Sequence, residues 1–163
     1  MSITNLLDKS QPRIGLGCMN LSHAYGVPVN EKTALETLNS AFDMGYRHFD
    51  TATLYGSGKN ELLLGKALKH KRQDFFLASK CGMAMVEGKK RIKGDPKTLR
   101  EECENSLRRL QTDHIDLYYL HRLDMSVPIE ESVGALGELV QEGKIGAIGL
   151  SEVSADTLLR GHK

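Results

Sequence analysis

Residues 115–121 read Ile-Asp-Leu-Tyr-Tyr-Leu-His, an almost continuous apolar run that ends at a histidine. A parallel strand needs such near-continuous hydrophobicity because both of its faces are buried. Four other apolar or branched runs have the same character, at residues 13–17, 47–49, 75–79 and 145–150. The sequence therefore predicts five parallel strands.

Segments with helical periodicity lie between these runs. Asn30 is a suitable cap for the first helix, and Gly45 stands just past its end. The other helices are expected at residues 60–68, from Pro96, after Pro128 and from Ser154. Strands and helices alternate strictly, and the strand starts are roughly 28 to 40 residues apart, which is the size of a crossover unit. This alternation predicts an α/β fold with a parallel sheet.

Two longer segments without periodicity, residues 20–29 and 81–94, follow the predicted first and third strands. We expect irregular loops at both places, at the carboxyl ends of strands where such folds build their sites. The second segment contains the densest basic group of the chain: Lys89, Lys90, Arg91 and Lys93. Glycines flank this group, which favours a solvated loop over a phosphate contact.

The overall composition is that of an ordinary globular protein. The chain has 40% hydrophobic residues, and its 22 basic and 21 acidic residues give a net charge of +1. Basic and acidic residues are interleaved, so we expect no nucleic-acid partner. No run of ~18 apolar residues is present, and residues 1–11 lack the apolar run of a secretory signal. These features predict a cytoplasmic protein without a membrane partner.

Three cysteines, Cys18, Cys81 and Cys103, are an odd number at spacings that fit neither a disulfide framework nor a metal knuckle. We interpret them as reduced thiols. Cys103 lies in a helical apolar stripe and is expected in the core, whereas Cys18 and Cys81 follow predicted strands and are expected near the site. The histidines show no ligand spacing either, so no metal site is predicted.

A polar residue directly follows each of four consecutive predicted strands: Asp50, Lys80, His121 and Ser151. The carboxyl ends of parallel strands meet at one edge of the sheet, so these side chains are expected at one rim. Tyr55 lies in the loop after Asp50, and we expect it to join them.

Tyrosine, lysine, aspartate and histidine together suit the protonation of a carbonyl oxygen. A free phenol has a pKa of ~10, which is too high for efficient acid catalysis near neutrality. A lysine ammonium ~4 Å away, at an effective dielectric of ~20, favours the phenolate by ~4 kcal/mol. An aspartate can keep that lysine charged, and a histidine can orient the carbonyl. Because no side chain delivers hydride, a nicotinamide cofactor is implied.

These residues resemble the signature of the aldo-keto reductase family. The signature corresponds to residues 44–52, Met-Gly-Tyr-Arg-His-Phe-Asp-Thr-Ala, with Tyr55 and Gly56 after it. Two dipeptides are similar to the next two strand ends of that family: Ser79-Lys80 and Leu120-His121. The resemblance spans almost the whole chain.

The resemblance implies roles for four residues, here called the tetrad: Asp50, Tyr55, Lys80 and His121. Tyr55 would be the general acid, and Lys80 the cation that tunes it. Asp50 would pair with the lysine, and His121 would orient the substrate.

The resemblance also implies NADPH as the usual reductant and a small-molecule carbonyl compound as the substrate. By the family pattern, Ser151 hydrogen-bonds the nicotinamide carboxamide, and Cys18 and Met19 border the cofactor. Asp50 and Glu152 complete the predicted cofactor-binding residues. Many relatives have asparagine where Glu152 stands.

Family members have eight strand–helix units in ~300 residues, which close into a TIM-type barrel. The five units here predict a partial barrel, truncated relative to the family and forming a single domain over residues 1–163. Such a partial barrel leaves two exposed sheet edges, which predict self-association.

Three alternatives were weighed against this interpretation. An open doubly wound sheet is another arrangement of five parallel units. A regulatory or scaffold subunit, resembling the potassium-channel β subunits, would keep the fold without the chemistry. Gly15 and Gly17 begin a dinucleotide fingerprint, but Asn20 stands at its third glycine, which excludes a Rossmann site.

Overall fold

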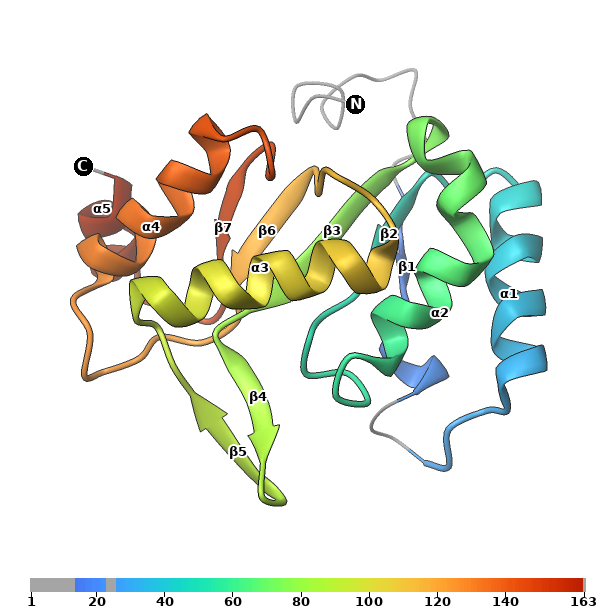
Figure 1. The fold of residues 1–163 in the computed structure, drawn as a ribbon, viewed down its shortest axis with the longest axis horizontal. Helices are drawn as coiled ribbons and strands as arrows, with labels where there is room; N and C mark the ends of the chain where they lie inside the picture. Colours follow the sequence, from blue (N-terminus) through green and yellow to red (C-terminus); the bar gives the residue numbers. More distant parts are fainter. Residues whose placement is uncertain (1–13, 23–25, 163) are drawn as a thin grey trace.

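The computed structural model describes residues 14–22 and 26–162 (Figure 1). The strands of its main sheet are β1 (Leu16–Gly17), β2 (His48–Asp50), β3 (Phe76–Cys81), β6 (Leu117–Leu120) and β7 (Ile148–Leu150). The helices are α1 (Glu31–Asp43), α2 (Lys59–Leu68), α3 (Pro96–Leu110), α4 (Ile129–Gln141) and α5 (Ala155–His162). Short 3-10 helices, η2 (Met19–Leu21) and η3 (Lys69–Asp74), follow β1 and α2. The opening residues 1–11, read above as lacking a secretory signal, lie outside the described residues.

All five strands of the main sheet are parallel and lie in the order β1-β2-β3-β6-β7. The prediction of five parallel strands is therefore confirmed. Their carboxyl ends share one edge, here called the carboxyl rim. Three strands, β1, β6 and β7, are shorter than the apolar runs suggested; Ile115 and Ile145 form only an isolated bridge ahead of β6 and β7. In contrast, β3 extends two residues past its predicted end, to Cys81.

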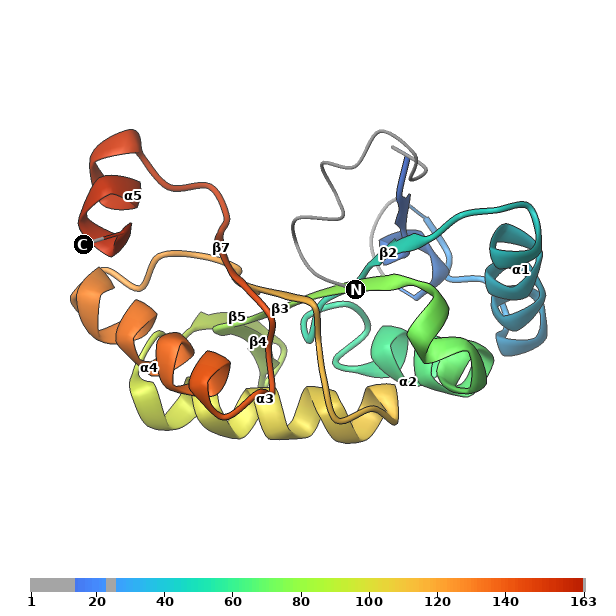
Figure 2. The same ribbon diagram turned by 90° about the horizontal axis from the view of Figure 1, so that it is seen from above.

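The sheet is curved, and the helices α1 to α4 pack on its outer side (Figure 2). Side chains alternate along each strand, so Leu77 and Tyr118 face the helices and belong to the main core. Phe76, Ala78 and Leu117 face the other way and form a separate apolar cluster on the inner side. An open doubly wound sheet carries helices on both faces. That alternative is therefore wrong, and the arrangement is that of a partial barrel.

The helix starts follow the expected capping chemistry. Asn30 Oδ1 accepts a hydrogen bond from the Thr33 backbone N–H at 2.9 Å, which caps α1. Asp95 Oδ1 accepts from Thr98 N at 3.0 Å and caps α3. The Thr98 hydroxyl and N–H together lower the pKa of the Asp95 carboxyl. The predicted starts of these two helices are confirmed.

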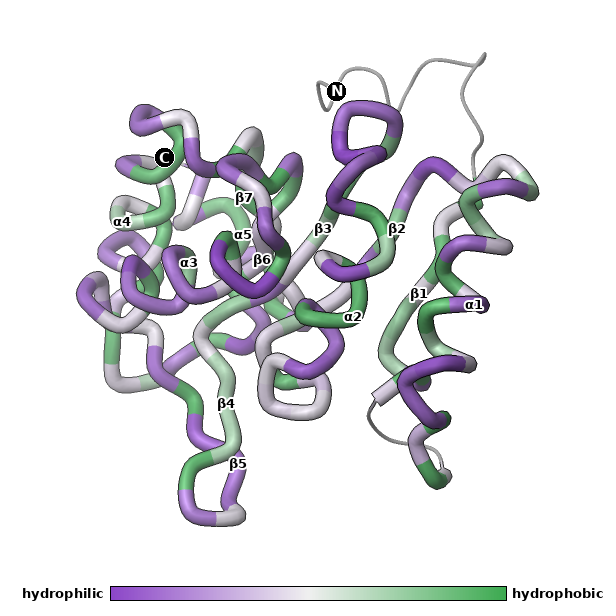
Figure 3. Tube along the Cα trace, turned by 45° about the vertical axis from the view of Figure 1, so that its right-hand side comes forward, coloured by the Kyte–Doolittle hydropathy of each residue, from purple (hydrophilic) through white to green (hydrophobic). Residues whose placement is uncertain are grey.

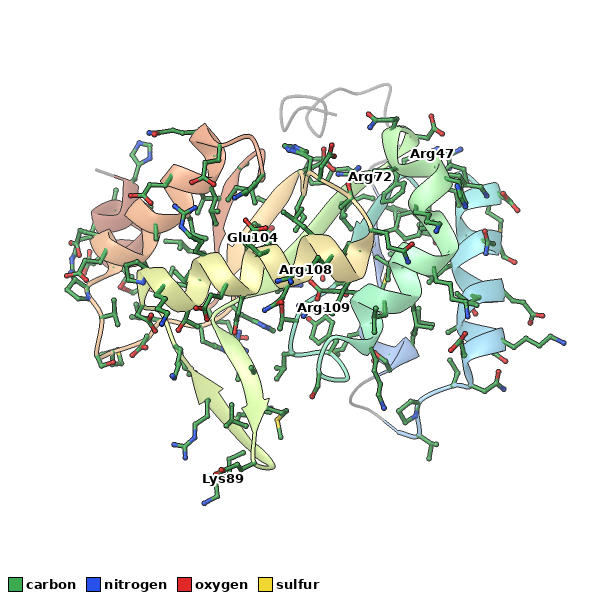
Figure 4. All side chains as sticks on the ribbon, in the orientation of Figure 1. Arg47, Arg72, Lys89, Glu104, Arg108 and Arg109 are labelled. Atoms are coloured by element: carbon green, nitrogen blue, oxygen red, sulfur yellow. The ribbon has the colours of Figure 1, made fainter. Side chains whose placement is uncertain are left out.

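The segment 81–94 is not an irregular loop, contrary to the sequence-based expectation. It forms an antiparallel hairpin of β4 (Met83–Val86) and β5 (Lys89–Ile92) that projects beyond the carboxyl rim (Figure 3). Its two-residue turn, Glu87 and Gly88, has positive φ angles of 50° and 74°, as the twist of a tight hairpin requires. The basic group lies mostly in β5, with Lys89 at the hairpin tip (Figure 4), and is exposed to solvent as predicted.

The described residues contain no helix long and apolar enough to cross a membrane. Across those same residues, no group of three or more histidine, cysteine or acidic side chains could hold a metal ion. All three cysteines are free and buried. Burial raises the pKa of the Cys18 and Cys103 thiols to about 12 and the pKa of Cys81 well above its ordinary value. These thiols therefore stay protonated and are poor nucleophiles.

Candidate active site

Lys80 reaches the carboxyl rim from β3, a strand buried along its whole length. Its ammonium donates to Asp50 Oδ1 at 2.5 Å and to the backbone oxygen of Thr51 at 2.9 Å. The lysine side chain is 11% exposed, whereas the Asp50 side chain is 34% exposed. The lysine of this ion pair is thus shielded from solvent, whereas the aspartate is accessible at the rim, where a ligand can approach.

Tyr55 lies in the loop after β2, and its ring is 5.2 Å from Lys80 Nζ. The ring also meets the imidazole of His121 edge to face, with 5.9 Å between the ring centroids. Both residues are buried, at 9% and 6% exposed. His121 is fixed by its backbone N–H, which donates to the Cys81 oxygen at 2.9 Å. The structure therefore brings the four tetrad residues into one cluster around the Lys80 ammonium.

Two side chains that the sequence did not single out also line this cluster. Met83, at the start of the hairpin, packs with Tyr55 and Met19 in a small apolar cluster. The ring of Tyr119 lies 5.8 Å from Lys80 Nζ on the inner side of the sheet. Burial and the nearby carboxylate of Asp50 raise the pKa of the Tyr119 phenol. Strand alternation could have placed Tyr119 beside Lys80, because its partner in the parallel register is Lys80 itself.

Cys18 and Met19 lie beside the tetrad, at the end of β1. The Cys18 N–H donates to the Asp50 backbone oxygen at 2.9 Å, which fixes the end of β1 against the end of β2. The Cys18 oxygen in turn accepts from the Asn60 amide at 2.8 Å. Asn60, expected only as a helix start, is fully buried and also accepts from the Thr51 hydroxyl at 2.6 Å.

Ser151 and Glu152 directly follow β7, next to His121. A residue that the sequence analysis missed, Arg122, connects them to the tetrad. Its guanidinium donates to the His121 oxygen at 2.6 Å, to Glu152 Oε1 at 2.8 Å and to Ser151 Oγ at 3.4 Å. Glu152 has a positive φ of 54°, an uncommon backbone conformation for a residue with a side chain. The hydroxyl of Ser151 is therefore held near the tetrad by an arginine.

The comparison with known protein families agrees with this fold. The model of the aldo/keto reductase family matches residues 13–161. The chain belongs to the aldo/keto reductase family. The predicted family resemblance is thereby confirmed.

Relatives within this aldo/keto reductase family are about twice as long as the chain. A probable aldo-keto reductase 1 from Glycine max is 48% identical over 152 residues, which cover 92% of this chain and 44% of the relative. The solved aldo-keto reductase AKR11C1 from Bacillus halodurans, in its holo form, is 38% identical with a TM-score of 0.80, over 90% of this chain and 48% of that one. The glycerol dehydrogenase AKR11B4 from Gluconobacter oxydans is 34% identical with a TM-score of 0.84, over 93% and 48%.

A third solved reductase, from Klebsiella pneumoniae, was determined in complex with NADP and acetate. It is 31% identical with a TM-score of 0.76, and the match covers 92% of this chain and 49% of that one. The chain thus spans about half the length of the family members it matches. Its five parallel strands correspond to a part of the family's barrel, as predicted.

Proposed function

We propose that the carboxyl rim is the active site of an NADPH-dependent reductase of aldehydes or ketones. One observation above all supports the proposal: the Lys80 ammonium is paired with Asp50 and lies 5.2 Å from the Tyr55 ring, with His121 against that ring. A cation fixed beside a phenol stabilises the phenolate that remains after the phenol has given its proton to a substrate.

The rim residues fit a nicotinamide cofactor. Ser151 offers a hydroxyl at the rim, where it can hydrogen-bond a carboxamide, and Arg122 holds that hydroxyl in place. The Cys18 thiol stays protonated because burial raises its pKa to about 12, so that it adds no negative charge beside the cofactor. Met19 supplies apolar surface. The NADP complex of the similar Klebsiella reductase supports the same cofactor here.

The proposed reaction needs one hydride and one proton. NADPH, when bound, supplies the hydride to the carbonyl carbon. Tyr55 donates its phenolic proton to the carbonyl oxygen, and the C=O bond becomes a C–OH bond. Lys80 stabilises the phenolate left on Tyr55, and Asp50 keeps the lysine charged and oriented. His121 orients the carbonyl oxygen toward the phenol.

The same site can serve either direction of the reaction. The reverse reaction, oxidation of an alcohol, uses the same groups with Tyr55 as the base. The similar glycerol dehydrogenase of Gluconobacter oxydans supports small hydroxy or carbonyl compounds as substrates.

The proposal is tested by adding an aromatic aldehyde to the shortest form of this protein that binds NADPH, with NADPH present, and following absorbance at the nicotinamide band. We expect aldehyde-dependent loss of NADPH, and its abolition by Lys80→Met. Tight NADPH binding without any consumption, with a range of aldehydes and ketones, would instead favour the scaffold-subunit alternative.

A further inference from the structure

A largely buried polar network lies beneath the tetrad, on the helix side of the sheet. It consists of five side chains from the loop after β2, α2, β3 and α3: Thr53, Glu61, Ser79, Ser106 and Arg109. Glu61 is its centre and is fully buried. The Glu61 carboxylate accepts from Ser79 Oγ at 2.6 Å and from Arg109 Nε at 2.6 Å. A carboxylate in this position depends on both partners, because burial removes the water that would otherwise solvate it.

Arg109 extends the network to the loop that holds Tyr55. It lies on the part of α3 that approaches α2 (Figure 4), and its Nη2 donates to Thr53 Oγ1 at 3.3 Å and to Ser106 Oγ at 3.2 Å. The arginine side chain also lies close to Gly58, where a Cβ atom would come within 2.7 Å of Arg109 Cδ. Gly58 has a φ of 89° and precedes α2. The position of Arg109 therefore constrains both ends of the loop around Tyr55.

The network also contacts the strand that holds Lys80. Ser79 is the residue before Lys80 in β3, and side chains alternate along a strand, so Ser79 points to the helices when Lys80 points to the rim interior. The backbone N–H of Thr53 donates to the Lys80 oxygen at 3.1 Å. Two members of the network thus fix the backbone of β3 and of the Tyr55 loop against each other.

A third connection leads to β6. Ser106 Oγ lies 3.1 Å from the hydroxyl of Tyr118, which is fully buried in the core. Burial raises the pKa of the Tyr118 phenol well above its ordinary value, so this hydroxyl stays protonated and can donate to the serine. Tyr118 stands three residues before His121. The network therefore ends within a few residues of three members of the tetrad.

We propose that Glu61 and Arg109 are positioning residues, which hold the loop of Tyr55 and the strand of Lys80 at the separation that carbonyl reduction requires. This inference rests on the proposed function. Neither side chain faces the rim, so both act through the backbone segments that their partners fix. A purely structural ion pair would affect folding alone, whereas a positioning pair also sets the rate of the chemical step.

The test is Glu61→Gln, which keeps the shape of the side chain and removes its charge. In the shortest active form of this protein we expect kcat to fall at least ~10-fold with little change in the KM for NADPH, because displacements of about 1 Å in a reacting group cost up to ~100-fold. The matched control is Asp116→Asn, which removes the charge of a second buried ion pair, with Arg72, at the other end of the same strands. That control is expected to lower the melting temperature and to leave kcat unchanged for the folded protein.

A second readout does not depend on activity. The methyl group of Met83, which packs against Tyr55, reports the position of the loop in ¹³C NMR spectra of methyl-labelled protein. Its signal should move in Glu61→Gln and stay in place in Asp116→Asn. If Glu61→Gln does not fold, Ser79→Ala removes the hydrogen bond to β3 without leaving a charged group unpaired. We then expect a smaller fall in kcat and a smaller shift of the Met83 signal.

Two outcomes would overturn the inference. Unchanged kcat and an unchanged Met83 signal in a folded Glu61→Gln variant would make the pair a structural one. Equal losses of kcat in Glu61→Gln and Asp116→Asn would do the same, because the effect would then follow stability. Failure of the proposed function looks different: the wild-type protein would lack aldehyde-dependent turnover, while the Met83 signal would still show whether the pair positions the loop.

Discussion

The two ends of the same parallel strands hold buried charges in contrasting ways. At the amino ends, Arg72 Nη2 donates to Asp116 Oδ2 at 2.6 Å, and their side chains are 13% and 1% exposed. The Leu77 N–H also donates to that carboxylate oxygen, at 2.8 Å. At the carboxyl rim, the acid of the Lys80–Asp50 pair is 34% exposed. The amino-end pair is closed within the protein, whereas the rim pair is open to a ligand.

The contrast agrees with the different roles of the two strand ends in barrels of parallel strands. Their amino ends contribute stability, and their carboxyl ends hold the site. Figure 4 places Arg72 at the end of the molecule opposite the hairpin that leaves the carboxyl rim. Substitutions at the two ends should therefore separate stability from activity.

The largest effect is expected at the amino ends. Asp116→Asn removes one charge of a buried pair and leaves the other without compensation, which costs about 3–5 kcal/mol of unfolding free energy. Urea unfolding at neutral pH measures this loss. A change of less than about 1 kcal/mol, the value of an exposed pair, would remove the contrast between the two ends.

At the carboxyl rim, Tyr55→Phe should act on turnover and not on folding. The variant loses the proposed proton donor, and we expect at least a ~100-fold fall in turnover, in the shortest active form of this protein, with little change in cofactor affinity. Steady-state kinetics and an NADPH titration measure the two quantities. Comparable turnover in the variant would assign the acid role to His121.

Much of this comparison was predictable from the sequence, because strand ends are local features. Asp50, Lys80 and His121 each follow an apolar run, and parallel topology places all such ends at one rim. The hairpin was not predicted because residues 81–94 are rich in glycine and charged residues, a composition typical of loops. The tight turn at Glu87 and Gly88, which allows the two strands to pair, is seen only in the structure.

The buried network could not be predicted in the same way. Glu61 and Arg109 lie 48 residues apart on two helices, and each on its own resembles a charged residue of a solvated helix face. Only the packing of α2 on α3 brings them together. The approach is close: a Cβ atom at Gly65 would come within 2.5 Å of the Arg109 oxygen. Such pairing leaves no local pattern in a single sequence.

The two edge strands of the sheet, β1 and β7, form a third region to compare with the two strand ends. Among the residues that the structure describes, β1 and β7 each have one edge without a strand partner, and unpaired backbone groups at an edge promote association. We predict that the chain alone self-associates or is only marginally folded. We also predict that it binds NADPH weakly, since the chain matches only 49% of the similar Klebsiella reductase that was determined with NADP.

Sedimentation velocity and a fluorescence titration with NADPH check both expectations for the isolated chain. A well-folded monomer with micromolar affinity for NADPH and measurable aldehyde reduction would contradict them together.

The smallest expected effect concerns pH. His48 packs edge to face on Phe76, with 5.0 Å between the ring centroids, and burial lowers its pKa from 6.5. The unfolded state then binds more protons than the folded state below about pH 6.5, so stability falls as the pH falls through that range. His48→Phe, which keeps the aromatic contact, should reduce the difference in unfolding free energy between pH 7 and pH 5.5. An equal difference in both proteins would show that His48 does not contribute to it.

The central claim is that the carbonyl group receives two species at the carboxyl rim. Its carbon receives a hydride from the cofactor, and its oxygen receives a proton from Tyr55. Single-turnover reduction of an aldehyde with NADPH deuterated at the transferred C4 position tests it most directly, in the shortest active form of this protein. The account predicts one deuterium on the carbinol carbon of the alcohol, a solvent-derived proton on its oxygen, and at least ~100-fold slower product formation in Tyr55→Phe. An alcohol without deuterium at that carbon, or equal rates in the two proteins, would contradict it.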